Sequence, residues 1–165
     1  MVYAVIRVKG TIHSVPKVRV TFELLRLTRC NHAVIIPENS YYKGMLQVVK
    51  DYVTWGEVSE EALLSMLKNY GRIEGNKQLT DEYLTSNTEY KTIEDLAKNI
   101  INGKLLLKTI PGMKPMFRLH PPVKGYRSVK RIVKKGGALG YRGKKINELI
   151  LKMSLPLDRG DVDAK

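Results

Sequence analysis

Disulfide bonds and membrane-spanning segments are the first structures that this sequence excludes. Its 165 residues include a single cysteine, Cys30, so no disulfide can form within the chain. This use of cysteine is typical of a reducing compartment, and we expect a cytoplasmic protein in which Cys30 is a small buried hydrophobic residue. No run of 18 apolar residues is present, which excludes a transmembrane helix, and charge interrupts the N-terminal stretch too early for a signal peptide.

Catalytic and metal-binding motifs are also scarce. The three histidines, His13, His32 and His120, are scattered, and Cys30 and His32 lack the second pair of ligands that a zinc site needs. There is no Gly-x-Ser-x-Gly nucleophile elbow and no P-loop. The glycines of residues 136–143 follow no buried strand and precede no acid at ribose distance, which argues against a dinucleotide site. We therefore predict a protein that is not an enzyme and needs no cofactor, metal or small-molecule substrate.

Acidic residues are nearly missing from one stretch of an otherwise mixed chain. The net charge is +13, and residues 114–152 alone hold twelve Lys and Arg residues against one acid, Glu148. Such a concentration of positive charge repels itself unless a polyanion lies nearby. Nucleic acid is the first expectation and an anionic membrane surface the second, while a merely solvated charged face stays as the plain alternative. We call residues 114–152 the basic segment.

Hydrophobic periodicity predicts five elements in the first 58 residues. Residues 2–9 alternate as a strand does, and residues 16–29 have helical spacing that begins at Pro16. A short buried strand over residues 33–36, a helix capped near Asn39 and a strand over residues 53–58 follow. This β-α-β-α-β order predicts an α/β layer in which helices cover one face of a small sheet.

The first predicted helix carries two apolar stripes. Val18 and Phe22 begin one stripe, which continues to Leu25, and the other contains Val20, Leu24 and Leu27. A helix that is apolar on two sides is expected to be covered on two sides. We therefore expect the second stripe to pack against a later part of the chain.

The rest of the chain, residues 59–165, reads as a mostly helical extension. Helices are predicted over residues 59–71, 92–103 and 144–153, because each has apolar residues at helical spacing and a start or stop signal. Residues 114–143 are rich in proline and then in glycine, so they are expected to form extended, basic, glycine-rich loops. The polar tail of residues 157–165 is expected to be mobile.

The basic segment combines residue types that suit contacts with RNA. Lys and Arg side chains neutralise phosphates and release counterions, and tyrosines can stack on unpaired bases. Glycines such as Gly136 and Gly137 let backbone N–H groups approach a phosphate, although they also serve turns alone. Tyr126, Tyr141 and His120 are ambiguous in the same way, since each could pack inside the protein instead.

Several long motifs occur in the order found in one ribosomal protein family. The run from Val18 to Ile36, together with residues 42–46 and 49–56, resembles the large-subunit ribosomal protein called L-thirty, or L-seven in eukaryotes. Residues 117–122 and 136–143 look like the longer archaeal and eukaryotic branch. The chain begins without a long basic arm, which favours the archaeal form.

The resemblance implies a ferredoxin-like core and a non-catalytic role in the large subunit, at one copy per ribosome, beside ribosomal RNA and neighbouring ribosomal proteins. From charge and glycine content we assign the RNA contacts to three arginines of the core and to residues of the basic segment: Arg19, Arg26, Arg29, Arg118, His120, Lys124, Arg127, Lys130, Arg131, Lys134, Lys135, Gly136, Gly137, Tyr141, Arg142, Lys144 and Lys145. An RNA-processing enzyme on a similar sheet is the rival from another class, and a free RNA-binding module or chaperone is a milder one.

Overall fold

The computed structural model describes residues 2–12 and 14–154, and the predicted mobile tail lies outside them. The first part of the chain has the predicted element order: β1 (Val2–Arg7), α1 (Pro16–Leu24), β2 (His32–Pro37), α2 (Ser40–Val49) and β3 (Val53–Glu57). The side chain of Asn39 caps α2 by accepting a hydrogen bond from the backbone N–H of Tyr42 at 2.8 Å. Local sequence signals therefore account for all five elements.

As far as Ser154, where the described residues end, the extension contains four α-helices and two very short strands: α3 (Glu60–Tyr70), α4 (Asp81–Asn87), α5 (Ile93–Ile101), β4 (Phe117–Arg118), β5 (Gly140–Tyr141) and α6 (Ile146–Ser154). Three of the helices were predicted. Helix α4 was not, because its seven residues include a single buried side chain, Leu84, and so show no periodicity. The two strands were also missed, since two residues carry no alternation and such strands exist only through their partners.

One five-stranded sheet lies at the centre of the molecule, in the order β4-β2-β1-β3-β5. Strand β1 is antiparallel to both β2 and β3, with Val5 opposite Val34 on one side and Trp55 on the other. The edges are completed by the extension: β4 pairs antiparallel with β2, and β5 pairs parallel with β3. The chain is thus a mixed α/β protein whose sheet includes strands from both parts of the sequence.

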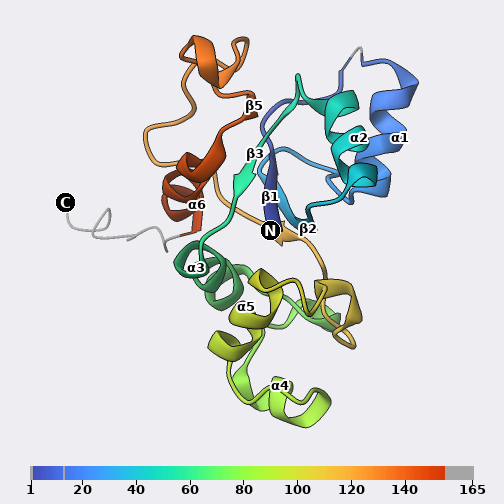
Figure 1. Cartoon of the computed structure of the whole chain (residues 1–165), viewed down its shortest axis with the longest axis vertical. Helices are drawn as coiled ribbons and strands as arrows, with labels where there is room; N and C mark the ends of the chain where they lie inside the picture. Colours follow the sequence, from blue (N-terminus) through green and yellow to red (C-terminus); the bar gives the residue numbers. More distant parts are fainter. Residues whose placement is uncertain (1, 13, 155–165) are drawn as a thin grey trace, which may run out of the picture.

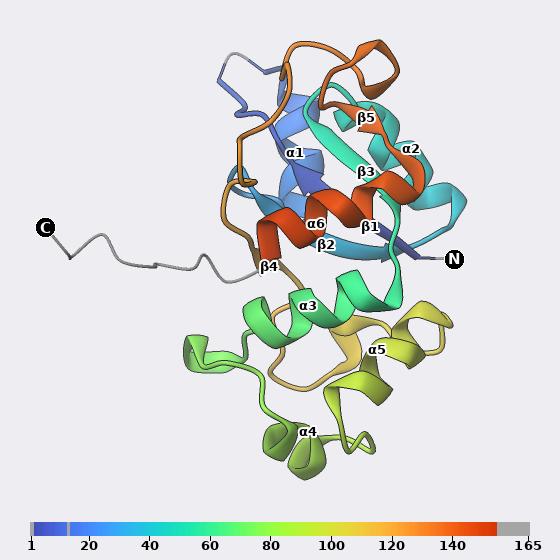
Figure 2. The same ribbon diagram turned by 90° about the vertical axis from the view of Figure 1, so that its left-hand side faces the viewer.

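Two hydrophobic cores lie on the two faces of this sheet. Tyr3 and Val5 of β1 pack in one core with Phe22 of α1 and residues of α2. Ala4 and Ile6 face the other way and join a larger core that includes α3, α5 and α6. Figures 1 and 2 show α1 and α2 on one side of the sheet and α3 and α6 on the other. The alternation predicted for β1 is confirmed, and both of its faces are buried.

The prediction that the extension covers the second stripe of α1 is wrong. Val20 and Leu24 are 53% and 60% exposed, because the extension packs on the opposite face of the sheet. The helix also ends at Leu24 rather than near Arg29. Arg26, two residues on, has φ 59°, a left-handed conformation that breaks the helix. Leu27 is fully buried, but it lies in the turn after the helix.

The expectation for Cys30 is wrong as well, since this residue is exposed. It lies in the turn that leads into β2, where the following residue, Asn31, has φ 63°. The buried residue that stabilises this turn is Arg7. Arg7, at the end of β1, is 5% exposed and donates hydrogen bonds of 2.7 Å to the carbonyl oxygens of Leu27 and Thr28.

Replacing Arg7 by lysine is expected to lower the free energy of unfolding by about 1–2 kcal/mol. Nη1 donates to both turn carbonyls, while Nε and Nη2 donate to the Lys9 carbonyl at 3.1 Å and the Thr11 hydroxyl at 3.2 Å. The guanidinium also lies 4.5 Å from the centre of the Phe22 ring, and a single ammonium cannot reach all of these partners. Urea unfolding measures the loss. Arg19→Lys, at an exposed position, is the matched control and should stay within about 0.5 kcal/mol of the parent chain. Equal stability of the two variants would contradict this role for Arg7.

Candidate nucleic-acid interface

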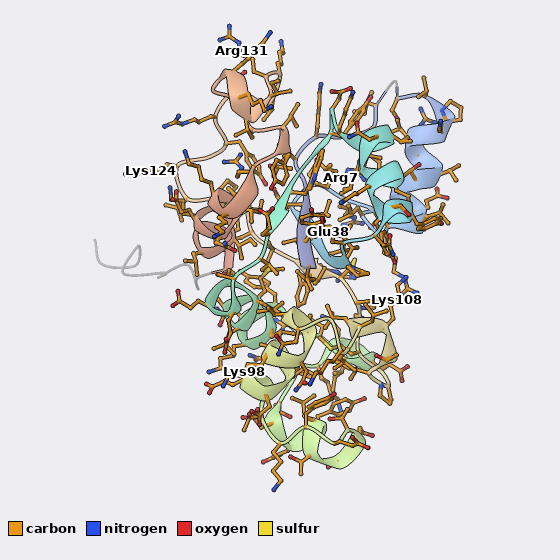
Figure 3. All side chains as sticks on the ribbon, viewed as in Figure 1. Arg7, Glu38, Lys98, Lys108, Lys124 and Arg131 are labelled. Atoms are coloured by element: carbon orange, nitrogen blue, oxygen red, sulfur yellow. The ribbon has the colours of Figure 1, made fainter. Side chains whose placement is uncertain are left out.

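Four cations of the basic segment stand on one protruding loop, residues 128–139, which we call the basic loop. Lys130, Arg131, Lys134 and Lys135 are all exposed, and no acidic residue lies in the loop. Figure 3 shows Arg131 at the outer end of the molecule, far from Lys98 of α5. Helix α4 lies at the opposite end of the long axis in Figure 1. Positive charge is therefore gathered at one end of the protein.

Backbone hydrogen bonds give the basic loop a defined shape. The N–H of Val133 donates to the carbonyl of Leu139 at 2.8 Å, and the N–H of Gly137 donates to that of Ile132 at 2.9 Å. A Cβ at Gly137 would lie 1.9 Å from the carbonyl oxygen of Arg131, so this position requires glycine for the fold of the loop. Ala138 and Leu139 anchor the loop by packing against Val8 next to β1.

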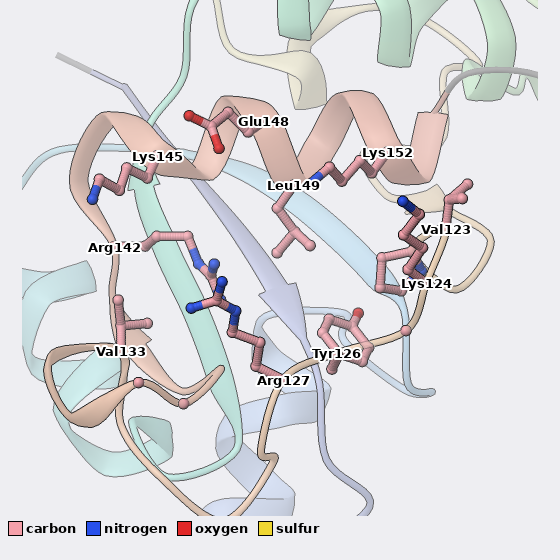
Figure 4. A pocket seen from close by; sticks show the side chains of 14 residues that line it. Val123, Lys124, Tyr126, Arg127, Val133, Arg142, Lys145, Glu148, Leu149 and Lys152 are labelled. Carbon is pink, nitrogen blue, oxygen red and sulfur yellow. The ribbon is translucent and has the colours of Figure 1, made fainter.

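A second group of cations surrounds an open cavity of 510 Å³ beside the basic loop. We call this cavity the basic pocket. Its charged lining residues come from three segments and are one acid, Glu148, and five cations: Lys124, Arg127, Arg142, Lys145 and Lys152. Figure 4 shows the side chains of Arg127 and Arg142 between the loop that carries Tyr126 and helix α6. Salt bridges do occur among the described residues, at Lys43–Glu38 and Lys68–Glu94, but they involve none of these five cations.

Arg142 is both a pocket residue and a structural one. Its Nε donates to the hydroxyl of Thr54 at 3.3 Å and its Nη2 to the carbonyl of Ala138 at 3.3 Å, while its backbone N–H donates to the Trp55 carbonyl at 2.8 Å. Burial lowers the pKa of this guanidinium, and the neighbouring charge of Arg127 lowers it further. The group stays charged at neutral pH, so two cations lie close together at the centre of the pocket.

The two tyrosines of the basic segment have different surroundings. Tyr126 is largely buried, and its hydroxyl donates to the Oδ1 of Asn31 at 2.8 Å, so it packs inside the protein. Burial raises the pKa of its phenol well above the ordinary value. Tyr141 is 48% exposed, and its hydroxyl donates to the carboxylate of Glu57. About half of the Tyr141 side chain is open to solvent, so base stacking remains a prediction for Tyr141 and not for Tyr126.

The remaining predicted residues do not all join one surface. Arg29 and Arg118 both lie close enough to His32 to lower its pKa, so a core arginine and one from the basic segment meet there. Arg19 lies on α1 and Arg26 just after it, on the other side of the sheet from the basic pocket. His120 lies on the side of the extension, with its ring 6.2 Å from that of Tyr70. Lys144 and Lys145 are exposed in the turn before α6, and Gly136 lines the pocket in a left-handed turn.

Lys152 is a pocket residue that the assignment from sequence left out. It follows Lys145 by seven residues, which places both on one side of α6 and its preceding turn. That spacing is the signal that would have found it. Asn147 holds this part of α6 in place, because its side chain accepts from the N–H of Ser59 at 2.8 Å and donates to the carbonyl of Glu57 at 3.1 Å.

Stability is expected to fall as the pH drops from about 7 to about 5, through the titration of His32. Its Nδ1 accepts a hydrogen bond from the backbone N–H of Arg29, and burial and then nearby arginines lower its pKa in the folded state. The unfolded chain therefore binds the proton more readily. The stability that neutral His32 contributes is therefore fully present above the pKa of histidine in the unfolded chain, and it is lost as the pH falls through the lower pKa of the folded state. The urea concentration at the unfolding midpoint should depend less on pH in His32→Gln than in the parent chain, whereas His120→Gln should keep the dependence of the parent chain. The same pH dependence in both variants would contradict the assignment to His32.

Neither a metal cluster nor a membrane span is found in the described part of the chain. No group of three or more His, Cys, Asp or Glu side chains in residues 2–12 and 14–154 could hold a metal ion. In the same residues, no helix is long and apolar enough to cross a bilayer. The fold and the surface together define a small, strongly basic, mixed α/β protein of the kind that suits a polyanion.

Comparison with known proteins places this chain in one family. Residues 3–53 match the family model described as Ribosomal protein L30p/L7e. Proteins named large ribosomal subunit protein uL30 are similar over 92% of this chain and 99% of their own length, with 50% identity in Methanosphaera stadtmanae, 48% in Archaeoglobus fulgidus and 44% in Methanocella arvoryzae. The chain belongs to this family of ribosomal proteins, whose members are structural and not enzymes. The resemblance predicted from the motifs is confirmed, including the archaeal form.

Proposed function

We propose that this protein is a constituent of the large ribosomal subunit in the cytoplasm, one copy in each particle, and that it binds ribosomal RNA through phosphate contacts and stabilises the folded RNA. The relatives are named for that subunit. The observation that carries the proposal is the basic segment, with twelve cations against one acid. At that charge ratio, an RNA backbone is the natural partner.

The two regions of the chain have separate tasks in this proposal. Residues 1–58 form a ferredoxin-like core, and residues 59–165 are an extension that carries the RNA-binding surface. The basic loop and the basic pocket supply most of the phosphate contacts, while Arg29 and Arg118 add a second contact region beside His32. Arg19 and Arg26 face another side, where they meet either RNA or a neighbouring ribosomal protein.

Sedimentation of a native cell lysate through sucrose tests the proposal. We expect the protein to move with the large subunit, in equal number with it, and to stay there through a high-salt wash. A protein that runs free, or that spreads over all RNA, would instead be a free RNA-binding or RNA-processing factor, and the structural role would be wrong.

A further inference from the structure

The basic pocket is arranged as a binding site and not merely as a charged surface. Its five cations come from the loop around Lys124, the turn before α6 and α6 itself, so the folded chain brings together charges that are distant in sequence. Holding like charges together costs free energy in the unbound protein, and Glu148 is the one acid among the described residues that line the pocket. An anion in the pocket removes that cost.

Arg142 is positioned in the pocket before any ligand arrives. Thr54 and the carbonyl of Ala138 each accept one of its N–H groups, which fixes the plane of the guanidinium. An arginine has five N–H donors, so further donors of the same fork remain for a ligand. Figure 4 shows the guanidinium of Arg127 next to that of Arg142; burial is the main cause of the lowered pKa of Arg142, and the charge of Arg127 lowers it further. Fixed, partly desolvated guanidinium groups bind an oxyanion more strongly than mobile exposed ones.

The loop at the rim of the pocket holds a lysine in an unusual conformation. Lys124 has φ 67°, in the left-handed region that favours glycine, and the next residue, Gly125, has φ 71°. The N–H of Gly125 donates to the carbonyl of Pro122 at 2.8 Å and closes this turn. The turn brings the Lys124 side chain to the edge of the pocket (Figure 4). Strain of this kind persists where the surrounding structure requires it, and it is common at ligand sites.

We propose that the basic pocket is a phosphate-binding site, in which Arg127 and Arg142 together grip one phosphate group of an RNA backbone and Lys124, Lys145 and Lys152 surround it. This inference rests on the proposed function for the identity of the RNA, and it adds a defined site to a broadly charged surface. The cavity of 510 Å³ is larger than one phosphate, which leaves room for the flanking nucleotides. Planar guanidinium pairs match the geometry of phosphate oxygens, as a single ammonium does not.

The test is a titration of the full chain with inorganic phosphate at constant ionic strength, followed by NMR of the arginine Nε–H groups. We expect the signals of Arg127 and Arg142 to shift together and to saturate, while that of Arg131 in the basic loop does not saturate. Arg127→Gln is expected to weaken phosphate binding at least about tenfold. Lys98→Gln removes one exposed positive charge at the other end of the protein and should leave the affinity unchanged.

A second experiment, on RNA binding, distinguishes a phosphate of the RNA backbone from free phosphate as the ligand of the pocket. Binding of large-subunit ribosomal RNA should weaken in Arg127→Gln but not in Lys98→Gln if the pocket holds a backbone phosphate. If the NMR shifts saturate with phosphate but the two variants bind the RNA equally well, the pocket is a site for free phosphate. That result would overturn the RNA assignment. Shifts of the two pocket arginines that do not saturate would overturn the site itself, while steeply salt-dependent RNA binding would still leave the proposed function standing.

Discussion

Removing the four charges of the basic loop is expected to weaken RNA binding strongly and to flatten its dependence on salt. In the variant Lys130→Gln, Arg131→Gln, Lys134→Gln and Lys135→Gln, the slope of log affinity against log salt should decrease in magnitude by about 3. Each phosphate contact contributes roughly 0.7–0.9 to that slope. Affinity at low salt should fall about 30-fold, at roughly 0.5 kcal/mol for each exposed ion pair. Filter binding to large-subunit ribosomal RNA over a range of salt concentrations measures both quantities.

The matched control removes four exposed lysines from the other end of the protein: Lys77, Lys91, Lys98 and Lys104, each changed to glutamine. The net charge falls by the same amount in both variants, so any effect of total charge is equal. If position matters, the control keeps a slope close to that of the parent chain. Equal flattening in both variants would show that the protein binds RNA through its overall charge, and the basic loop would lose its assigned role.

The second large effect is expected at Gly56 of β3, which packs directly against the backbone of the turn before α6. A Cβ at this position would lie 2.0 Å from the carbonyl oxygen of Gly143, which is backbone and cannot turn away. Gly56→Ala should therefore push the turn before α6 away from β3 and lower the free energy of unfolding by about 2–3 kcal/mol. Urea unfolding gives the loss directly.

Gly44→Ala provides the control for this substitution. Gly44 lies inside α2, and nothing lies within 4 Å of a Cβ built there, so alanine should raise the free energy of unfolding by about 0.5–1 kcal/mol. The same chemical change thus has opposite signs at the two positions. A Gly56→Ala protein as stable as the parent chain would mean that β3 and the Gly143 turn are not held as closely as the structure indicates.

The elements that sequence reasoning predicted are those with a periodicity of their own. Strand β1 alternates over six residues, and α3 begins with a Ser59 cap and two acids, so local signals were sufficient for both. Strands β4 and β5 have two residues each and exist only because β2 and β3 offer open edges. Periodicity shows that a helix has an apolar face but not which element covers it. For this reason the extension was wrongly expected to pack on the second apolar stripe of α1.

For the candidate site too, the composition of the sequence predicted one part and only the folded geometry revealed the other. Counting charges was enough to select the basic segment, because a ratio of twelve to one is visible in any conformation. The convergence of Arg127, Arg142 and Lys152 was not predictable, since it depends on how α6 lies against the loop that carries Tyr126. Gly137 was assigned to RNA, but the close approach of the Arg131 carbonyl now gives it a structural reason.

Chemical footprinting of lysines in purified large subunits tests most directly whether the basic segment lies against RNA. Seven lysines of that segment are exposed in the free chain: Lys124, Lys130, Lys134, Lys135, Lys144, Lys145 and Lys152. We expect acetylation to be slow at these lysines in the subunit and fast again after ribonuclease digestion. Equal reactivity in the intact subunit and the free chain, or protection that ribonuclease leaves unchanged, would contradict the account.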